Sequence, residues 1–303
     1  MPTAADWFTI AMLIAAPIAL VWLWRRDVVG PGSLRRLAAS GLLRDPSAIS
    51  GAAWLACAMA TFLSMAVGAG AARSLLHAAG LSEAAEKALR DLAGYGLAVT
   101  VGVLCAALLA RPSPPRERER IGLACRPRDA IAGAGAILLT LPLCIAAATA
   151  SAFLARAISG APPERLAHDT LRALTADRWT WTALLGSALV VVGAPLVEEL
   201  VYRVFLQSAL VSFIATLRAR AEGREPRATA GDAAAGIALA TVVFVAPHAA
   251  ALGGPVTWHA LPSLAVLSLA MGLAYERTRS PMVPIVMHAG FNAFNLAAAM
   301  LLT

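Results

Sequence analysis

Long blocks of apolar residues without a single charge constrain this chain more than any other feature of its sequence. A helix that crosses a lipid bilayer needs about 20 consecutive, mostly apolar residues. In the first half of the chain, blocks of this kind cover residues 7–24, 46–72, 92–110 and 130–155. Each block is about as long as a bilayer crossing requires, or longer, so we expect a membrane-spanning helix in each.

The second half of the chain continues the pattern. A fifth block runs from 179 to 217 and contains three charged residues. Residues 233–275 carry no charge and are too long for one span, but the Gly-Gly-Pro sequence at 253–255 predicts a turn that divides them. The last three spans are then 234–253, 259–275 and 280 to the C-terminus. The predicted fold class is an all-α membrane bundle of about eight transmembrane helices.

The composition excludes the main alternatives to a membrane protein. Hydrophobic residues make up 59% of the chain and charged residues 14%, whereas a soluble domain has about 25% charged residues. So few charges cannot cover a soluble protein of this size, and they also exclude a disordered chain. The formal net charge is +7, but the basic residues are dispersed through short loops. They form no stripe that would bind nucleic acid, so we expect the lipid bilayer as their surroundings.

The distribution of basic residues among the loops predicts the orientation of the helices. Of the 25 Lys and Arg residues, 17 lie in alternate loops, and the loops between them hold seven. The richer loops are 25–45, 111–129, 218–232 and 276–279. Cytoplasmic loops are the ones enriched in Lys and Arg, so both termini are expected to face away from the cytoplasm. Lys87 is the single lysine beside 24 arginines. With the many alanines, this bias suggests a GC-rich coding sequence and therefore a bacterial source, in which the membrane would be the plasma (inner) membrane.

Three charged residues interrupt the fifth block: Glu198, Glu199 and Arg203. Each charge at the centre of a transmembrane helix costs roughly 2.5–3.5 kcal/mol of insertion free energy. Glu199 and Arg203 are four residues apart, so they share a helix face and can form an ion pair. Glu198 lies about 100° away around the helix, so a packing role for the pair does not explain it. Pro195 removes a backbone hydrogen bond just before the acids and should bend the helix.

Two further apolar helices carry polar groups at membrane depth. His248 follows Pro247 in the sixth block, with Phe244 one turn before it. His288 and Asn292 are four residues apart on one face of the last helix. Taken singly, each could be an ordinary interhelical hydrogen-bonding residue. Polar groups on three helices together favour a functional site, which their depth along the helices places in the cytoplasmic half of the bilayer.

The order of these residues resembles the motif set of one family. The three motifs are Glu198-Glu199-x-x-x-Arg203, Phe244-x-x-x-His248 and His288-x-x-x-Asn292. Together they are similar to those of the CPBP intramembrane proteases, which include the type II CAAX prenyl endopeptidases and the bacteriocin-processing or Abi proteins. The resemblance covers residues 179–303. Val204 departs from it, since a Gly commonly follows the motif arginine, and we expect this to affect packing only.

The resemblance implies a division of roles within the site. Glu198 and His248 would hold and deprotonate a water molecule, which is general-base catalysis. His288 and Asn292 would donate hydrogen bonds to the oxyanion that forms when water attacks a peptide carbonyl.

The remaining motif residues and the cofactor follow from the same resemblance. Glu199 and Arg203 would brace the site. The family is often called metalloprotease, and zinc could be held by Glu198, His248 and His288. A glutamate mechanism without metal also suits this set, and we favour it slightly.

Other classes of function stay open. The same fold could serve as a non-enzymatic immunity or scaffold protein that binds a membrane partner, or as a proton-coupled transporter. The complete set of polar residues favours the enzyme, because binding alone would not need it. We therefore expect an endopeptidase that acts on a membrane-associated peptide or protein. Residues 1–156 would form N-terminal transmembrane helices and residues 179–303 the catalytic membrane core of one integral membrane unit.

Overall fold

The computed structural model describes residues 4–30, 32–39, 48–111, 121–160, 174, 178–251 and 257–302. These residues form helices joined by turns, and no strand occurs among them. Within these ranges, eight helices are long and apolar enough to cross a membrane. The prediction of an all-α polytopic membrane bundle is therefore confirmed. The predicted turn at 253–255, residues 112–120 of the predicted loop at 111–129, and most of the predicted loop at 156–178 lie outside the described residues.

In the first half of the chain, two long helices form a tight antiparallel pair. The helices of this half are α1 (Ala4–Arg25), α2 (Ser33–Ala39), α3 (Gly51–Leu76), the short η1 (His77–Ala79), α4 (Glu83–Ala110) and α6 (Pro127–Ser159). Where α3 meets α4, a Cβ atom on Gly68 would lie 2.6 Å from the Ala93 carbonyl oxygen. A Cβ atom on Gly94 would lie 2.9 Å from the Met65 carbonyl oxygen. Only glycine permits this approach of the two backbones.

The second half of the chain begins with one long helical run over residues 181–222. Its sections are α8 (Trp181–Ala188), η2 (Leu189–Gly193), α9 (Ala194–Glu199), η3 (Leu200–Gln207) and α10 (Ser208–Glu222). It is followed by α11 (Ala230–Ala251), η4 (Thr257–Ala260), α12 (Leu261–Thr278) and α13 (Met282–Leu302).

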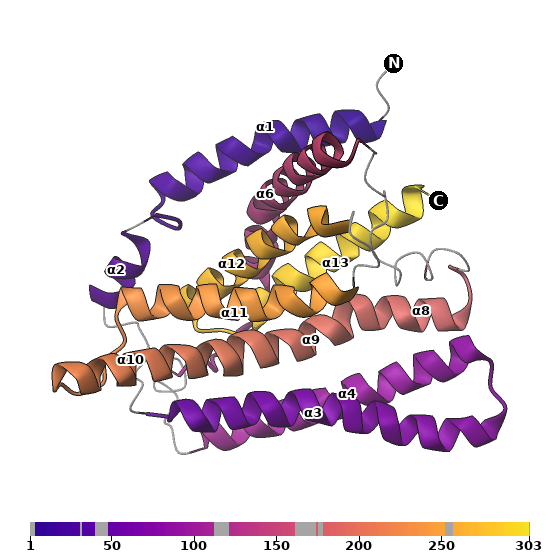
Figure 1. Ribbon diagram of the computed structural model, residues 1–303, viewed down its shortest axis with the longest axis horizontal. Coiled ribbons are helices and arrows are strands. Elements are labelled where there is room, and N and C mark those ends of the chain that lie inside the picture. The colour runs from indigo at the N-terminus through magenta and orange to yellow at the C-terminus, as the bar shows by residue number, and fades with distance from the viewer. Residues whose placement is uncertain are drawn as a thin grey trace.

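This long run lies in the middle of the bundle (Figure 1). The α3–α4 pair lies along one side of the run, and α11 lies along the other. Beyond α11 come α12 and α13, and α6 packs against both of them and against α1. The acidic residues of the fifth block therefore sit where the N-terminal and C-terminal helices meet.

The helix α4 begins earlier than its charge-free block, which starts at residue 92. The charge-free blocks 46–72 and 92–110 predict a loop over residues 73–91 between them, but α3 continues to Leu76 and α4 begins at Glu83. The Ser82 hydroxyl accepts a hydrogen bond from the Ala85 N–H and caps the helix. The acidic side chains of Glu83 and Glu86 in the first turn interact favourably with the positive end of the helix dipole. Charges therefore mark the end of the apolar block here, but not the end of the helix.

Large apolar side chains cover the outer faces of the helices. Ile18, Val67, Leu138 and Phe153 are each more than 60% exposed. Apolar surface on this scale is unusual for a soluble monomer. It suits contact with lipid tails, as expected for an integral membrane protein.

Candidate active site

The long run departs from α-helical geometry on both sides of the acidic pair. The segments η2 and η3 are π-helical, a form in which the N–H of residue i donates to the carbonyl of residue i−5. The Ala194 N–H, for instance, donates to the Leu189 carbonyl. The next donor in this series would be residue 195, but Pro195 has no N–H. The Val190 carbonyl loses that donor and instead accepts a hydrogen bond from the Asn292 side-chain amide, over 2.9 Å.

Pro195 was expected to bend the helix, and its effect in the structure is a widened π-helical turn before the proline. The helical run continues through the proline to residue 222, with a widened turn before it. The unpaired carbonyl is used to attach α13 to the run, since Asn292 lies on α13. Segments of π-helix inside α-helices occur frequently at functional sites, and here two of them flank Glu198 and Glu199.

Glu199 is fully buried and is held from two sides. The Arg203 Nε donates to Glu199 Oε2 over 2.9 Å, which is the ion pair that the four-residue spacing predicts. The His288 Nδ1 lies 2.9 Å from Glu199 Oε1. Because the carboxylate paired with Arg203 can only accept, this His288 nitrogen is the donor. The other ring nitrogen, Nε2, faces Glu198, whose Oε2 is 4.0 Å away.

The guanidinium of Arg203 packs against an aromatic cluster. Its Cζ lies 4.9 Å from the centre of the Phe244 ring, within the range of a cation–π contact. Its Nη1 and Nη2 have no hydrogen-bond partner among the described residues. The Phe244 ring centre is also 5.2 Å from that of Tyr202, 4.8 Å from that of His248 and 5.8 Å from that of His288. Phe244 thus joins the three motif helices in one cluster.

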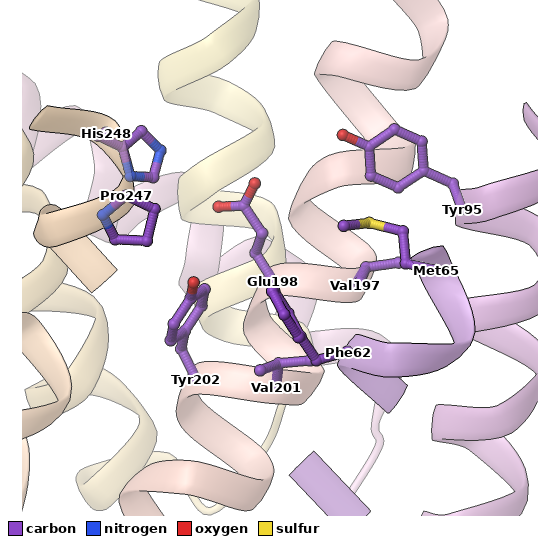
Figure 2. A pocket seen from close by; sticks show the side chains of 9 residues that line it. All are labelled: Phe62, Met65, Tyr95, Val197, Glu198, Val201, Tyr202, Pro247 and His248. Carbon is purple, nitrogen blue, oxygen red and sulfur yellow. The ribbon is translucent and has the colours of Figure 1, made fainter. Parts of the chain in front are cut away.

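A cavity of about 250 Å³ lies beside Glu198 (Figure 2). It is lined by residues of α3, α4, α9, η3 and α11, namely Phe62, Met65, Tyr95, Val197, Glu198, Val201, Tyr202, Pro247 and His248. Most of these side chains are apolar. The Glu198 Oε2 has no hydrogen-bond partner among the described residues. An unpaired carboxylate oxygen in such a place requires water or a polar group of a ligand in the cavity.

His248 faces the same cavity from α11 (Figure 2). Its Nδ1 lies 2.8 Å from the Phe244 carbonyl oxygen. A carbonyl oxygen only accepts, so Nδ1 carries a proton and the neutral ring keeps a lone pair on Nε2. A carboxylate and an imidazole lone pair therefore share one mainly apolar cavity, where both can accept hydrogen bonds from a water molecule.

The two residues that the resemblance assigns to an oxyanion hole are directed elsewhere. His288 is buried and its Nδ1–H donates a hydrogen bond to Glu199, so a neutral ring has no second N–H to donate. The Asn292 amide donates to the Val190 carbonyl. Neither residue lines the cavity beside Glu198. Their oxyanion role stays a prediction, and this arrangement does not favour it.

Two polar cavity residues were missed by the sequence reasoning. Tyr202 lies one helical turn after Glu198, and this spacing on one face is a signal that could have identified it. Tyr95 lies on α4, far from the motif region, and no local pattern indicates its position. The same holds for Phe62 and Met65 of α3. The N-terminal helices therefore form part of the cavity wall.

The described ranges contain no group of three or more His, Cys, Asp or Glu residues that could hold a metal ion. Zinc held by Glu198, His248 and His288 stays a prediction. The His288 Nδ1 bonds to Glu199 and the His248 Nδ1 to a backbone carbonyl, so the Nε2 of each ring is the nitrogen that could bind a metal or a water molecule.

These features define an integral membrane protein with a carboxylate–histidine site inside its helical bundle. Residues 179–294 match the family model described as Type II CAAX prenyl endopeptidase Rce1-like. The matched region contains all three motifs, and the match supports the resemblance of this part of the chain to CAAX protease-like membrane proteins. No curated protein and no solved structure matches the chain. The helices α3 and α4, which complete the cavity, precede the matched region.

Proposed function

We propose that this protein is an intramembrane endopeptidase that hydrolyses peptide bonds of membrane-associated polypeptides. The observation that carries the proposal is the cavity shared by Glu198 and His248, in which the Glu198 Oε2 lacks a described partner. The family match supports the class of reaction. A paired structural carboxylate would have its oxygens satisfied, as those of Glu199 are.

In the proposed reaction, one water molecule lies between the carboxylate of Glu198 and the Nε2 of His248. The water donates one hydrogen bond to each, so its lone pair is directed at the carbonyl carbon of the substrate. As the water attacks, its proton passes to Glu198, which acts as general base. Glu198 later returns this proton to the nitrogen of the leaving amine. The apolar lining keeps bulk water away and strengthens these interactions.

The residues behind the cavity hold this base in place. Glu199 is ionised through its pair with Arg203 and fixes the proton of His288 on Nδ1. The Nε2 of His288 then lies 4.0 Å from the Glu198 Oε2, where it limits the positions open to that carboxylate. These three side chains act as positioning residues, because none of them lines the cavity.

The proposal is tested with purified protein reconstituted in liposomes with a pool of single-span peptides that differ in their flanking sequences. Cleavage products are identified by mass spectrometry. We expect the wild type to cleave members of the pool and Glu198→Gln to cleave none, because the amide keeps the shape of the side chain but cannot take a proton. Glu276→Gln is the control, since Glu276 is also a carboxylate inside the bundle but does not line the cavity.

The outcomes separate the activity from its mechanism. A wild type that cleaves no peptide would contradict the endopeptidase function. Cleavage by Glu198→Gln at the wild-type rate would contradict only the role of Glu198 as base. A third arm treats the wild type with a chelator. We expect unchanged turnover, and a loss that added zinc restores would contradict the metal-free mechanism.

We also propose that the cavity lies in the cytoplasmic half of a bacterial plasma membrane. The proposal is supported by the bias of Lys and Arg toward the loops at 25–45, 111–129, 218–232 and 276–279. Reporter fusions in the loop at 218–232 and at the C-terminus should give opposite signals, cytoplasmic and external. A cytoplasmic signal from the C-terminal fusion would contradict this orientation.

A further inference from the structure

A cluster of exposed arginines lies where the chain passes from α1 to α2. Arg25 is the last residue of α1 and Arg26 follows it, while Arg35 and Arg36 belong to α2. All four residues are exposed. None of them lines the cavity beside Glu198, so the cluster is separate from the candidate active site.

Asp27 holds this cluster together. It follows α1 in a left-handed conformation, with φ at +55°, which ends the helix and lets the chain turn toward α2. Its carboxylate pairs with the guanidinium of Arg36. Its carbonyl oxygen accepts a hydrogen bond from the Arg277 Nη1, near the end of α12, over 3.1 Å. Five arginines and one aspartate thus meet here, with a formal excess of four positive charges.

The packing of α2 fixes the arginines that it carries. Leu37 is buried and forms a small apolar cluster with Ala233 of α11. Figure 1 shows α2 beyond the end of α1 and beside the start of α11. Arg35 and Arg36 therefore extend from a helix that is packed against the bundle, which lowers the entropy cost of binding a ligand.

Exposed tryptophans place the cluster at the level of the lipid headgroups. Trp22 and Trp24, in the last turn of α1, are 44% and 58% exposed. The Cζ of Arg26 lies 5.6 Å from the centre of the Trp22 ring. Tryptophan is enriched at the interface between membrane and water. Guanidinium groups beside these rings therefore lie at the depth of the lipid phosphates.

Two arginines of the cluster keep all their side-chain donors available. Arg36 and Arg277 are held by Asp27, whereas the guanidinium groups of Arg25 and Arg35 have no hydrogen bond or ion pair among the described residues. A guanidinium binds phosphate oxygens through pairs of parallel hydrogen bonds. Basic clusters directly beside a transmembrane helix attract anionic lipids.

We propose that this cluster binds the phosphates of anionic phospholipid headgroups, with Arg25 and Arg35 as its free donors. The bound lipid neutralises the excess positive charge at the junction of α1, α2 and α12. This site is independent of the endopeptidase function, since it requires neither the cavity nor a peptide substrate.

The test measures the binding of single lipids to the full-length protein in detergent by native mass spectrometry. The protein is titrated with phosphatidylglycerol, which is anionic, and with phosphatidylcholine, which has no net charge. Each arginine near a membrane surface changes the affinity for an anionic lipid about fivefold. We therefore expect the double variant Arg25→Gln, Arg35→Gln to bind phosphatidylglycerol about 25-fold more weakly than the wild type. Its affinity for phosphatidylcholine should not change, which also shows that the variant is folded.

The control removes the same charge elsewhere on the same side of the bundle. Arg220 and Arg224 are exposed at the end of α10, which lies on the side where α1 ends (Figure 1). The double variant Arg220→Gln, Arg224→Gln should keep the wild-type affinity for phosphatidylglycerol. An equal loss in this control would overturn the site, because net charge alone would then explain the binding.

Two further results would contradict the proposal. Equal affinities of the wild type for the two lipids would show that the cluster does not select anionic headgroups. Glycerol 3-phosphate carries the same phosphate chemistry without acyl chains, and we expect no competition from it at the concentration of the lipid. Displacement of phosphatidylglycerol at that concentration would assign the cluster to a soluble phosphate compound.

Discussion

Among the described residues, two carboxylate–arginine pairs are buried on both sides, one beside the cavity and one at the end of α12. In the first, Arg203 and Glu199 are completely buried and 2.9 Å apart. In the second, Arg279 and Glu276 are 2.6 Å apart, with side-chain exposures of 6% and 0%. Both pairs form within one turn of helix or its end, so each follows from local spacing.

The second partner of each carboxylate is where the two pairs differ. Glu199 accepts from the side chain of His288, which in turn faces Glu198 and the cavity. Glu276 accepts from Gln207, whose amide nitrogen also donates to the Gly272 carbonyl, over 3.1 Å. The first pair therefore connects to a group that faces an open space, and the second connects to backbone.

The surroundings of Arg279 show what the second pair stabilises. Arg279 ends α12 in a left-handed conformation, with φ at +56°. Its carbonyl accepts from the Ala124 N–H, and the neighbouring Tyr275 hydroxyl donates to the Gly122 carbonyl. The Glu276 pair thus fixes the end of α12 against the segment that precedes α6. The same chemical device positions a reactive group in one place and a chain connection in the other.

The largest expected difference between the pairs comes from removing each arginine. Arg203→Ala leaves Glu199 as an unpaired buried charge, which costs about 3–5 kcal/mol of unfolding free energy. The proton of His288 can then move from Nδ1 to Nε2, so we expect cleavage per folded molecule to be lost. Thermal unfolding in detergent and the liposome assay measure the two effects separately.

Arg279→Ala is the matched substitution at the second pair. We expect a loss of stability of the same order, because Glu276 is also buried. Cleavage per folded molecule should stay at the wild-type level, since the further partner of Glu276 is Gln207, which does not line the cavity, whereas that of Glu199 is His288, which faces Glu198. Equal losses of activity in the two variants would remove the functional distinction between the pairs.

A smaller effect is expected where Asn292 replaces the hydrogen bond that Pro195 cannot make. Asn292→Ala leaves the Val190 carbonyl without its donor, at a cost of roughly 1–2 kcal/mol. Pro195→Ala restores a backbone N–H at the position that the π-helical series requires, so Asn292→Ala should cost less in that background. Thermal unfolding of the two single variants and the double variant measures this coupling.

The same variants discriminate between the two roles for Asn292. If Asn292 is an oxyanion donor, Asn292→Ala should lower kcat by about 10²–10³-fold in either background. If Asn292 only positions the helical run, Asn292→Ala should lower kcat little, and Pro195→Ala should restore most of the lost stability. Turnover of the folded protein therefore decides between the roles.

The part of this fold and site that the sequence predicts is the part controlled by local spacing. Charge-free blocks predict the transmembrane helices, because only a helix satisfies its own backbone in lipid. Four-residue spacing predicts the Glu199–Arg203 pair and the separation of Glu198 from it, since both depend on one helix turn.

The remainder depends on contacts between distant segments. Tyr95 reaches the cavity because α4 packs closely on α3 and on the central run, and no local pattern reports that packing. The partner of Asn292 depends on the π-helical register before Pro195, which shifts the unpaired carbonyl to Val190. The His288 contact with Glu199 likewise arises from the packing of α13 against α9.

The smallest expected effect concerns Tyr275, which precedes Glu276 of the second pair. Tyr275→Phe removes the hydrogen bond to the Gly122 carbonyl and keeps the buried ring, so we expect a loss of about 0.5–1.5 kcal/mol of unfolding free energy. The effect should be confined to the contact between α12 and the segment before α6, which hydrogen exchange at residues 121–126 can locate. Cleavage should be unchanged, because Tyr275 does not line the cavity. If turnover fell while this segment stayed protected, the end of α12 would be coupled to the cavity, and the two pairs would serve one site.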